Sequence, residues 1–120
     1  MAKSGSDNIN LDIILDSQGC LKRMKAKGHA EGEPGKNIPC ALVSSYLRTA
    51  ARLLESRGFV VQGKAGAPGS YDLALPGHDR SQTLYLKGVT DYLLKALWDI
   101  RKDYPGNLNI TIEDDDSGGR

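Results

Sequence analysis

Residues 9–28, which read INLDIILDSQGCLKRMKAKG, decide the fold. From Ile9 to Leu15 every second side chain is apolar, which is the period of a half-buried strand. The cluster from Asp16 to Gly19 has the composition of a turn. The chain then continues as a second strand, from Cys20 to Gly28. The stretch therefore predicts two consecutive strands joined by a short turn.

The two faces of the second strand carry different side chains. Its basic residues share one face and comprise Arg23, Lys25 and Lys27. We expect this row to face water, with a partner-binding surface as the alternative. By strand parity Cys20 points with Met24 into the core, and we interpret it as a structural cysteine.

A loop and then a helix are predicted after the second strand. Residues 28–39 hold three glycines and two prolines, a composition that resists both a sheet ladder and a helix. Asn37 suits the N-cap of the following helix, Pro39 is tolerated in its first turn, and Gly58 stops it. The apolar stripe of this helix comprises Cys40, Val43, Leu47, Ala50 and Leu54.

The second half of the chain predicts three more strands and one helix. Residues 59–62 and 71–75 form a hairpin pair, with residues 63–69 as the turn, and residues 108–112 form the last strand. The second helix ends at Tyr104, and its start is either at Thr90 or near Gln82.

The resulting order, strand-strand-helix-strand-strand-helix-strand, predicts an α+β fold. Two helices cannot cover both faces of a wide parallel sheet, so we expect a mostly antiparallel or mixed sheet with helices packed on it. The chain of 120 residues has room for one domain, over residues 8–113. Residues 1–7 are expected to be a flexible N-terminus without a secretion signal, and residues 114–120 a flexible acidic tail.

The composition excludes several classes of protein. A formal net charge of +1 argues against a nucleic-acid binder that acts through bulk charge, and only 6% of the residues are aromatic, so no stacking platform is expected. No apolar run is long enough to span a bilayer. Two cysteines do not make a disulfide framework, which favours a cytoplasmic, reduced protein.

The candidate chemistry lies between residues 28 and 45. His29 sits where a strand ends, and Cys40 falls in the first turn of a helix, where unpaired N–H groups and a partial positive charge stabilise a thiolate. An imidazole within reach can take the thiol proton, and the same N–H groups can bind an oxyanion. The alternative is that Cys40, which lies on the apolar stripe, is only a core residue.

No metal or nucleotide cofactor is predicted. The possible zinc ligands are Cys20, His29, Cys40 and His78, but no two of them have the close spacing of structural zinc pairs. We expect His78 to be solvated in the turn of residues 76–80. The glycine-rich stretches do not match a phosphate-binding loop.

The motif Gly28-His29-Ala30, followed by a loop and then by residues 35–44 (GKNIPCALVS), resembles the ribosomal-processing cysteine protease (Prp) family. The family pattern is Gly-His-Ala, a variable glycine-containing loop, and Asp-Ile-Val-Cys-Ala-x-x-Ser. The order of strands and helices matches as well, down to Tyr104-Pro105 before the last strand.

The resemblance implies a homodimeric peptidase that removes a short N-terminal extension from a large-subunit ribosomal protein, cutting after an aromatic residue. By position, Cys40 matches the nucleophile and His29 the general base. The other matching positions of the motif and the substrate loop are Gly28, Ala30, Gly35, Ala41 and Ser44. No cofactor, membrane or nucleic-acid partner is implied.

Two positions depart from the family pattern. Asn37 replaces Asp, and it can still orient the imidazole by a hydrogen bond or cap the helix. Pro39 replaces Val and stiffens the approach to Cys40. These departures leave an alternative open, a non-catalytic ribosome-associated module that binds peptides on the same scaffold.

Overall fold

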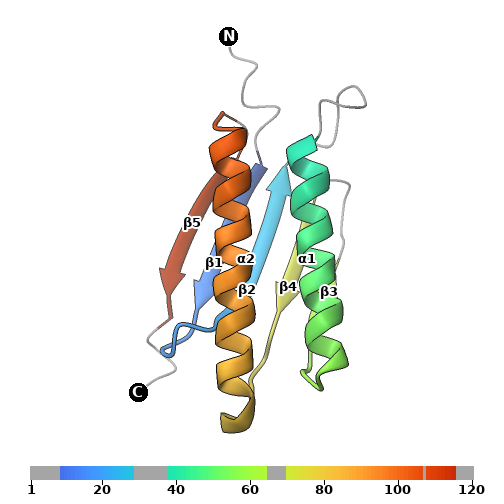
Figure 1. Cartoon of the computed structure of the whole chain (residues 1–120), viewed down its shortest axis with the longest axis vertical. Helices are drawn as coiled ribbons and strands as arrows, with labels where there is room; N and C mark the ends of the chain where they lie inside the picture. Colours follow the sequence, from blue (N-terminus) through green and yellow to red (C-terminus); the bar gives the residue numbers. More distant parts are fainter. Residues whose placement is uncertain (1–8, 29–37, 65–69, 107, 116–120) are drawn as a thin grey trace.

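The computed structural model describes residues 9–28, 38–64, 70–106 and 108–115 (Figure 1). The elements follow in the order β1 (Ile9–Leu15), β2 (Leu21–Gly28), α1 (Ile38–Ser56), β3 (Gln62–Lys64), β4 (Ser70–Ala74), η2 (Arg80–Gln82, a 3-10 turn), α2 (Thr83–Asp103) and β5 (Leu108–Asp114). This order of strands and helices is the predicted one, and the α+β fold class is confirmed.

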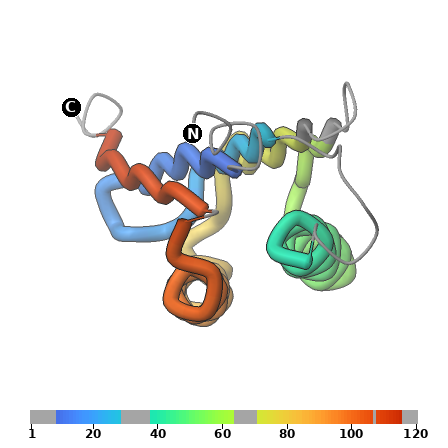
Figure 2. The backbone as a smooth tube through the Cα atoms, turned by 90° about the horizontal axis from the view of Figure 1, so that it is seen from above, coloured from blue at the N-terminus to red at the C-terminus, as the bar shows by residue number. Residues whose placement is uncertain are grey.

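The strands form one mixed sheet in the order β3-β4-β2-β1-β5. The pairs β1–β2, β2–β4 and β3–β4 are antiparallel, while β1 and β5 run parallel. Both helices cover the same face of this sheet, as the view along the layers shows (Figure 2). The fold is therefore a two-layer structure in which one sheet face has no helix on it.

The core lies between the sheet and the helices. Leu11 and Ile13 of β1 are buried while Asp12 is exposed, and Met24 of β2 is buried between exposed basic neighbours. The helices contribute buried residues at helical spacing, among them Val43, Leu47, Ala50 and Leu54 of α1, and Leu86, Leu93, Leu97 and Ile100 of α2. The predicted faces of β1, β2 and α1 are thus confirmed.

The end of α1 follows from Gly58, as predicted. Gly58 adopts φ +87°, a left-handed conformation that an L side chain rarely takes. The chain folds back there, so that Phe59 N–H donates to Leu54 O over 3.0 Å and Gly58 N–H donates to Glu55 O over 3.0 Å. These bonds satisfy carbonyls that the helix end would otherwise leave unpaired.

The first strand of the predicted hairpin was misplaced. The structure has β3 at Gln62–Lys64 instead of residues 59–62, and Phe59 precedes the strand. Phe59 is buried in the helix-to-strand connection, where its ring stacks on Tyr85 with 6.1 Å between centroids. Phe59 is therefore apolar because it packs against α2, and it does not belong to a strand.

Of the two predicted starts of α2, the earlier one, near Gln82, is confirmed. The helix begins at Thr83, and Thr90 lies inside it, fully buried. The Thr90 hydroxyl accepts a hydrogen bond of 2.9 Å from Leu21 N–H at the start of β2. Thr90 is therefore not a helix cap, and it instead satisfies a backbone group of the sheet.

Candidate functional site

Cys40 is the third residue of α1, and its side chain is half-buried. The helix starts at the end of the sheet where β2 finishes, so the first turn of α1 and the last residue of β2 belong to the same end of the molecule (Figure 1). No acidic residue lies in that first turn to offset the partial positive charge of the helix start. This placement gives a thiol both access and an anion-stabilising environment.

The packing of α1 explains how Cys40 comes to be held there. Val43 and Leu47 are buried on the sheet-facing side of the helix, and Cys40 continues their stripe at its N-terminal end. Pro39 is also buried and occupies the first turn, where a missing N–H breaks no helical hydrogen bond. Cys40 thus stands where the core opens to solvent.

The other motif residues divide into described and undescribed positions. Gly28 ends β2 and pairs with Ile9 of β1, while Ala41 is exposed and Ser44 is half-buried, one turn after Cys40. The remaining predicted site residues lie outside the described residues: His29, Ala30, Gly35 and Asn37. Gly28, the last described residue before this gap, ends β2 at the end of the sheet where α1 starts (Figure 1).

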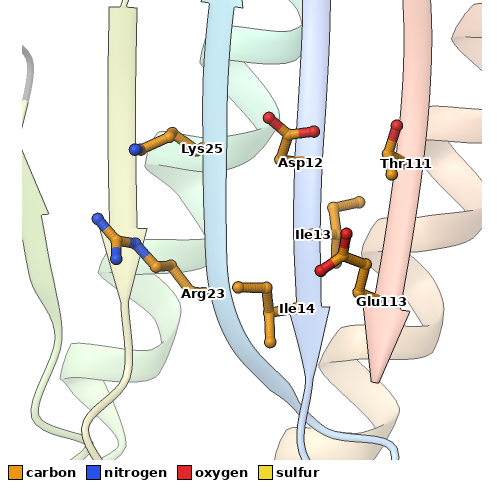
Figure 3. A pocket seen from close by; sticks show the side chains of 7 residues that line it. All are labelled: Asp12, Ile13, Ile14, Arg23, Lys25, Thr111 and Glu113. Carbon is orange, nitrogen blue, oxygen red and sulfur yellow. The ribbon is translucent and has the colours of Figure 1, made fainter. Parts of the chain in front are cut away.

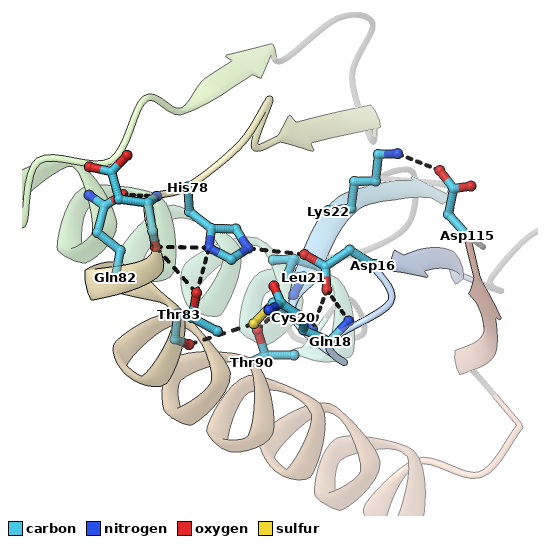
Figure 4. Close-up of polar contacts among 11 residues, drawn as sticks. Asp16, Gln18, Cys20, Leu21, Lys22, His78, Gln82, Thr83, Thr90 and Asp115 are labelled. Atoms are coloured by element: carbon cyan, nitrogen blue, oxygen red, sulfur yellow. Dashed lines mark hydrogen bonds and ion pairs between the residues drawn. The ribbon is translucent and has the colours of Figure 1, made fainter. Parts of the chain in front are cut away.

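A second group of polar side chains gathers at the opposite end of the sheet (Figure 4). His78 Nε2 lies 3.1 Å from Asp16 Oδ2, and His78 Nδ1 lies 3.1 Å from Thr83 Oγ1. Cys20 Sγ lies 3.6 Å from Thr83 O. The predicted solvation of His78 is wrong, because its side chain is only 10% exposed.

Within this group the pKa values of Asp16 and Cys20 shift in opposite directions. Burial acts to raise the pKa of Asp16, but hydrogen bonds from His78 and from the backbone N–H groups of Cys20 and Gln18 outweigh it, and the pKa is lowered. Burial, and then the negative charge of Asp16, raises the pKa of the Cys20 thiol. Cys20 is completely buried, as the strand parity predicted. Cys20 is therefore a buried, protonated thiol.

The sequence argument missed the pairing of Asp16 with His78 for a physical reason. The two residues are 62 positions apart and meet only because the turn after β1 and the segment before α2 lie at one end of the sheet. The spacing of Asp16 and Cys20, four residues apart, was available in the sequence. Spacing among cysteines and histidines alone does not reveal this pair, because Asp16 contributes a carboxylate.

The sheet face that carries no helix has an open hollow of about 320 Å³ (Figure 3). Its polar lining mixes both signs of charge and includes Asp12, Arg23, Lys25 and Glu113. Arg23 also forms a two-bond ion pair with Asp72 of β4, at 2.8 and 3.2 Å. The basic row of β2 thus faces solvent, as predicted, and acidic neighbours accompany it.

Neither of the described helices α1 and α2 is long and apolar enough to cross a membrane.

Comparison with known proteins gives a consistent result. A family model described as cysteine protease Prp matches residues 8–109. No curated protein sequence matches the chain. The solved structure of SMU.848 from Streptococcus mutans is similar, with a TM-score of 0.75 and 19% identity over 91% of this chain and 97% of that one.

Two further similar structures are complexes of the essential ribosomal processing protease Prp from S. aureus, one with a substrate peptide and one with a covalently linked product peptide. Each has a TM-score of 0.72 and 19% identity, and each alignment covers 87% of this chain and 98% of that one.

Proposed function

This chain belongs to the cysteine protease Prp family, and we propose that it is an endopeptidase in which Cys40 is the nucleophile and His29 the general base. The observation that carries the proposal is the position of Cys40, half-buried in the first turn of α1 beside the end of β2. A core cysteine would be sealed, as Cys20 is, whereas Cys40 retains access to solvent. The motif order His29 before Cys40 supports the pairing.

The proposed reaction needs no group beyond the chain and water. The Cys40 thiol gives its proton to His29, and the thiolate sulfur bonds to the carbonyl carbon of the peptide while the carbonyl electron pair moves onto oxygen. First-turn N–H groups of α1 bind that oxyanion. As the carbon–nitrogen bond breaks, His29 returns the proton to the leaving amine, and water then hydrolyses the thioester to an acid and the free thiol.

Asn37 is the proposed positioning residue. Its side chain precedes Cys40 by three residues and can hold the imidazole of His29 by a hydrogen bond or cap the start of α1. An amide is sufficient for orientation in a thiolate–imidazolium pair, because the pair already carries the balancing charges. The motif residues Gly28, Ala30, Gly35, Ala41 and Ser44 are proposed to line the path of the substrate backbone.

The proposed substrate is the N-terminal extension of a large-subunit ribosomal protein. Support comes from the family and from the S. aureus relative, a ribosomal processing protease that was solved with a substrate peptide. We further propose that the protein acts in the cytoplasm as a homodimer during ribosome assembly.

The test is cleavage of a synthetic peptide that spans the N-terminus of the host's own ribosomal protein. We expect the full-length protein to cut once, after an aromatic residue, and the Cys40→Ala variant to be inactive, with the products identified by mass spectrometry. Equal cleavage by wild type and Cys40→Ala would end the proposed mechanism. Binding of the peptide without cleavage would favour a non-catalytic module, which the Asn37 departure motivates.

A further inference from the structure

We propose that Asp16, Cys20 and His78 form a binding site for a divalent transition-metal ion of the zinc class, separate from the Cys40 end of the molecule. The three residues supply a carboxylate oxygen, a thiolate sulfur and an imidazole nitrogen, and these ligand atoms all lie within 4.8 Å of one another. Among the described residues, this is the group of three histidine, cysteine or acidic side chains that lie close enough together to share an ion. All three donor types are ordinary zinc ligands.

The separations are close to those that a bound ion requires. Oxygen and nitrogen ligands of tetrahedral zinc lie about 3.3 Å apart, since each is about 2.0–2.1 Å from the metal. Asp16 Oδ2 and His78 Nε2 are already 3.1 Å apart. One ligand atom from each of the three residues lies within 4.8 Å of the others, so side-chain movements on the order of 1 Å bring all three to tetrahedral distances.

The turn after β1 holds the Asp16 carboxylate in the required orientation (Figure 4). Asp16 Oδ1 accepts hydrogen bonds from Gln18 N–H at 2.9 Å and from Cys20 N–H at 3.0 Å. These bonds occupy one oxygen and leave Oδ2 directed at His78. Gly19 makes the turn possible with φ +78°, so Asp16 and Cys20 are held on the same side of it.

The surroundings of His78 suit a metal-binding imidazole. His78 Nε2 lies 3.1 Å from Asp16 Oδ2, and His78 Nδ1 lies 3.1 Å from Thr83 Oγ1, whose hydroxyl donates to Asp79 O over 3.2 Å. With a metal on Nε2 the proton resides on Nδ1, where Thr83 Oγ1 at 3.1 Å and Asp79 O at 3.4 Å are both acceptors. Metal-bound histidines ordinarily donate their second N–H in this way.

An ion can reach the cluster from one side. Asp16 and His78 line an open pocket of about 270 Å³, and the sulfur of the fully buried Cys20 lies within 4.8 Å of a ligand atom of each. A water molecule in the pocket can complete a four-coordinate ion, which three protein ligands leave open. The ion pair between Lys22 and Asp115 stands at the rim of the same pocket.

The charge of the loaded site balances. A divalent ion replaces the thiol proton of Cys20, so thiolate, carboxylate and metal together carry no net charge, and one proton is released to solvent. The amine of Lys87, which lies near Gly19, is already paired with Asp91 at 2.7 Å. A neutral assembly of this kind can be buried at low cost compared with an unpaired ion.

The test is titration of the untagged full-length Cys40→Ser variant with Co²⁺, a spectroscopic substitute for Zn²⁺. Removing Cys40 leaves Cys20 as the only thiol in the chain. We expect a near-ultraviolet thiolate-to-cobalt charge-transfer band that saturates at one ion per chain, and its loss on competition with Zn²⁺. Absence of this band, or Co²⁺ binding without it, would overturn the proposal.

Four further variants in the Cys40→Ser background separate ligands from neighbours. Asp16→Asn and His78→Gln should each weaken Co²⁺ binding about tenfold or more, while Asp79→Asn, which changes an exposed carboxylate next to His78, should leave it unchanged. Cys20→Ala should abolish the band. Equal affinities in His78→Gln and Asp79→Asn would show that the ion binds elsewhere. Circular dichroism of each variant establishes that it is folded.

Discussion

The two cysteines of this chain lie at opposite ends of the same sheet, each beside the start of a helix, and their surroundings give them opposite properties. Cys40 lies in the first turn of α1 and remains partly accessible. Cys20 contacts the first residue of α2 through Thr83 O, is completely buried, and has a raised pKa. Of the two thiols, only that of Cys40 has the access to solvent that a reactive cysteine needs.

The largest expected effect separates the two cysteines by activity. Cys40→Ala should lower the rate of peptide cleavage by about 10³-fold or more, because the covalent intermediate can no longer form. Cys20→Ala should keep activity within a few-fold, provided that the protein is folded by circular dichroism. A loss of equal size in both variants would contradict the comparison, because it would make Cys20 as essential to the chemistry as Cys40.

Thiol alkylation should distinguish the two ends next. Iodoacetamide at pH 7 is expected to modify Cys40 in the folded protein, and His29→Ala should slow this reaction about tenfold or more by removing the base. Cys20 should react only after unfolding, because no part of it is exposed. Peptide mapping by mass spectrometry identifies the modified residue. Fast native modification of Cys20 would contradict its burial.

Stability measurements should show that a buried hydrogen bond at the Cys20 end contributes to the free energy of unfolding. Thr90→Val removes the hydroxyl that accepts Leu21 N–H and leaves that buried group unpaired, which should lower the free energy of unfolding by about 1–3 kcal/mol. The matched control is Thr49→Val on the exposed side of α1, which should change stability little. Urea denaturation compares the two variants. Similar midpoints for both would mean that the Thr90 bond contributes nothing.

The smallest effect is expected on the sheet face without helices. Arg23 and Asp72 pair there in contact with solvent, and exposed ion pairs gain little over hydration. Arg23→Ala should therefore leave the urea midpoint within experimental error. A clear destabilisation would show that the Arg23–Asp72 pair contributes more to stability than exposed ion pairs ordinarily do.

Local patterning in the sequence predicted most of the fold because each element here obeys a local rule. Alternation from Ile9 to Leu15 identified the buried face of β1, and Gly58 identified the end of α1, since both depend on neighbouring residues only. Phe59 was misassigned to a strand because its burial depends on Tyr85 of the distant helix α2. Apolar character alone does not distinguish these two kinds of burial.

The candidate sites divide along the same line. The sequence by itself determined the α+β class, the order of strands and helices and the place of Cys40 in a first helical turn, because these follow from period and order along the chain. Only the tertiary structure decided that His78 is buried against Asp16 and that β1 lies parallel to β5. Such contacts join residues far apart in sequence, and they form only when the packed sheet and helices bring those residues to the same place.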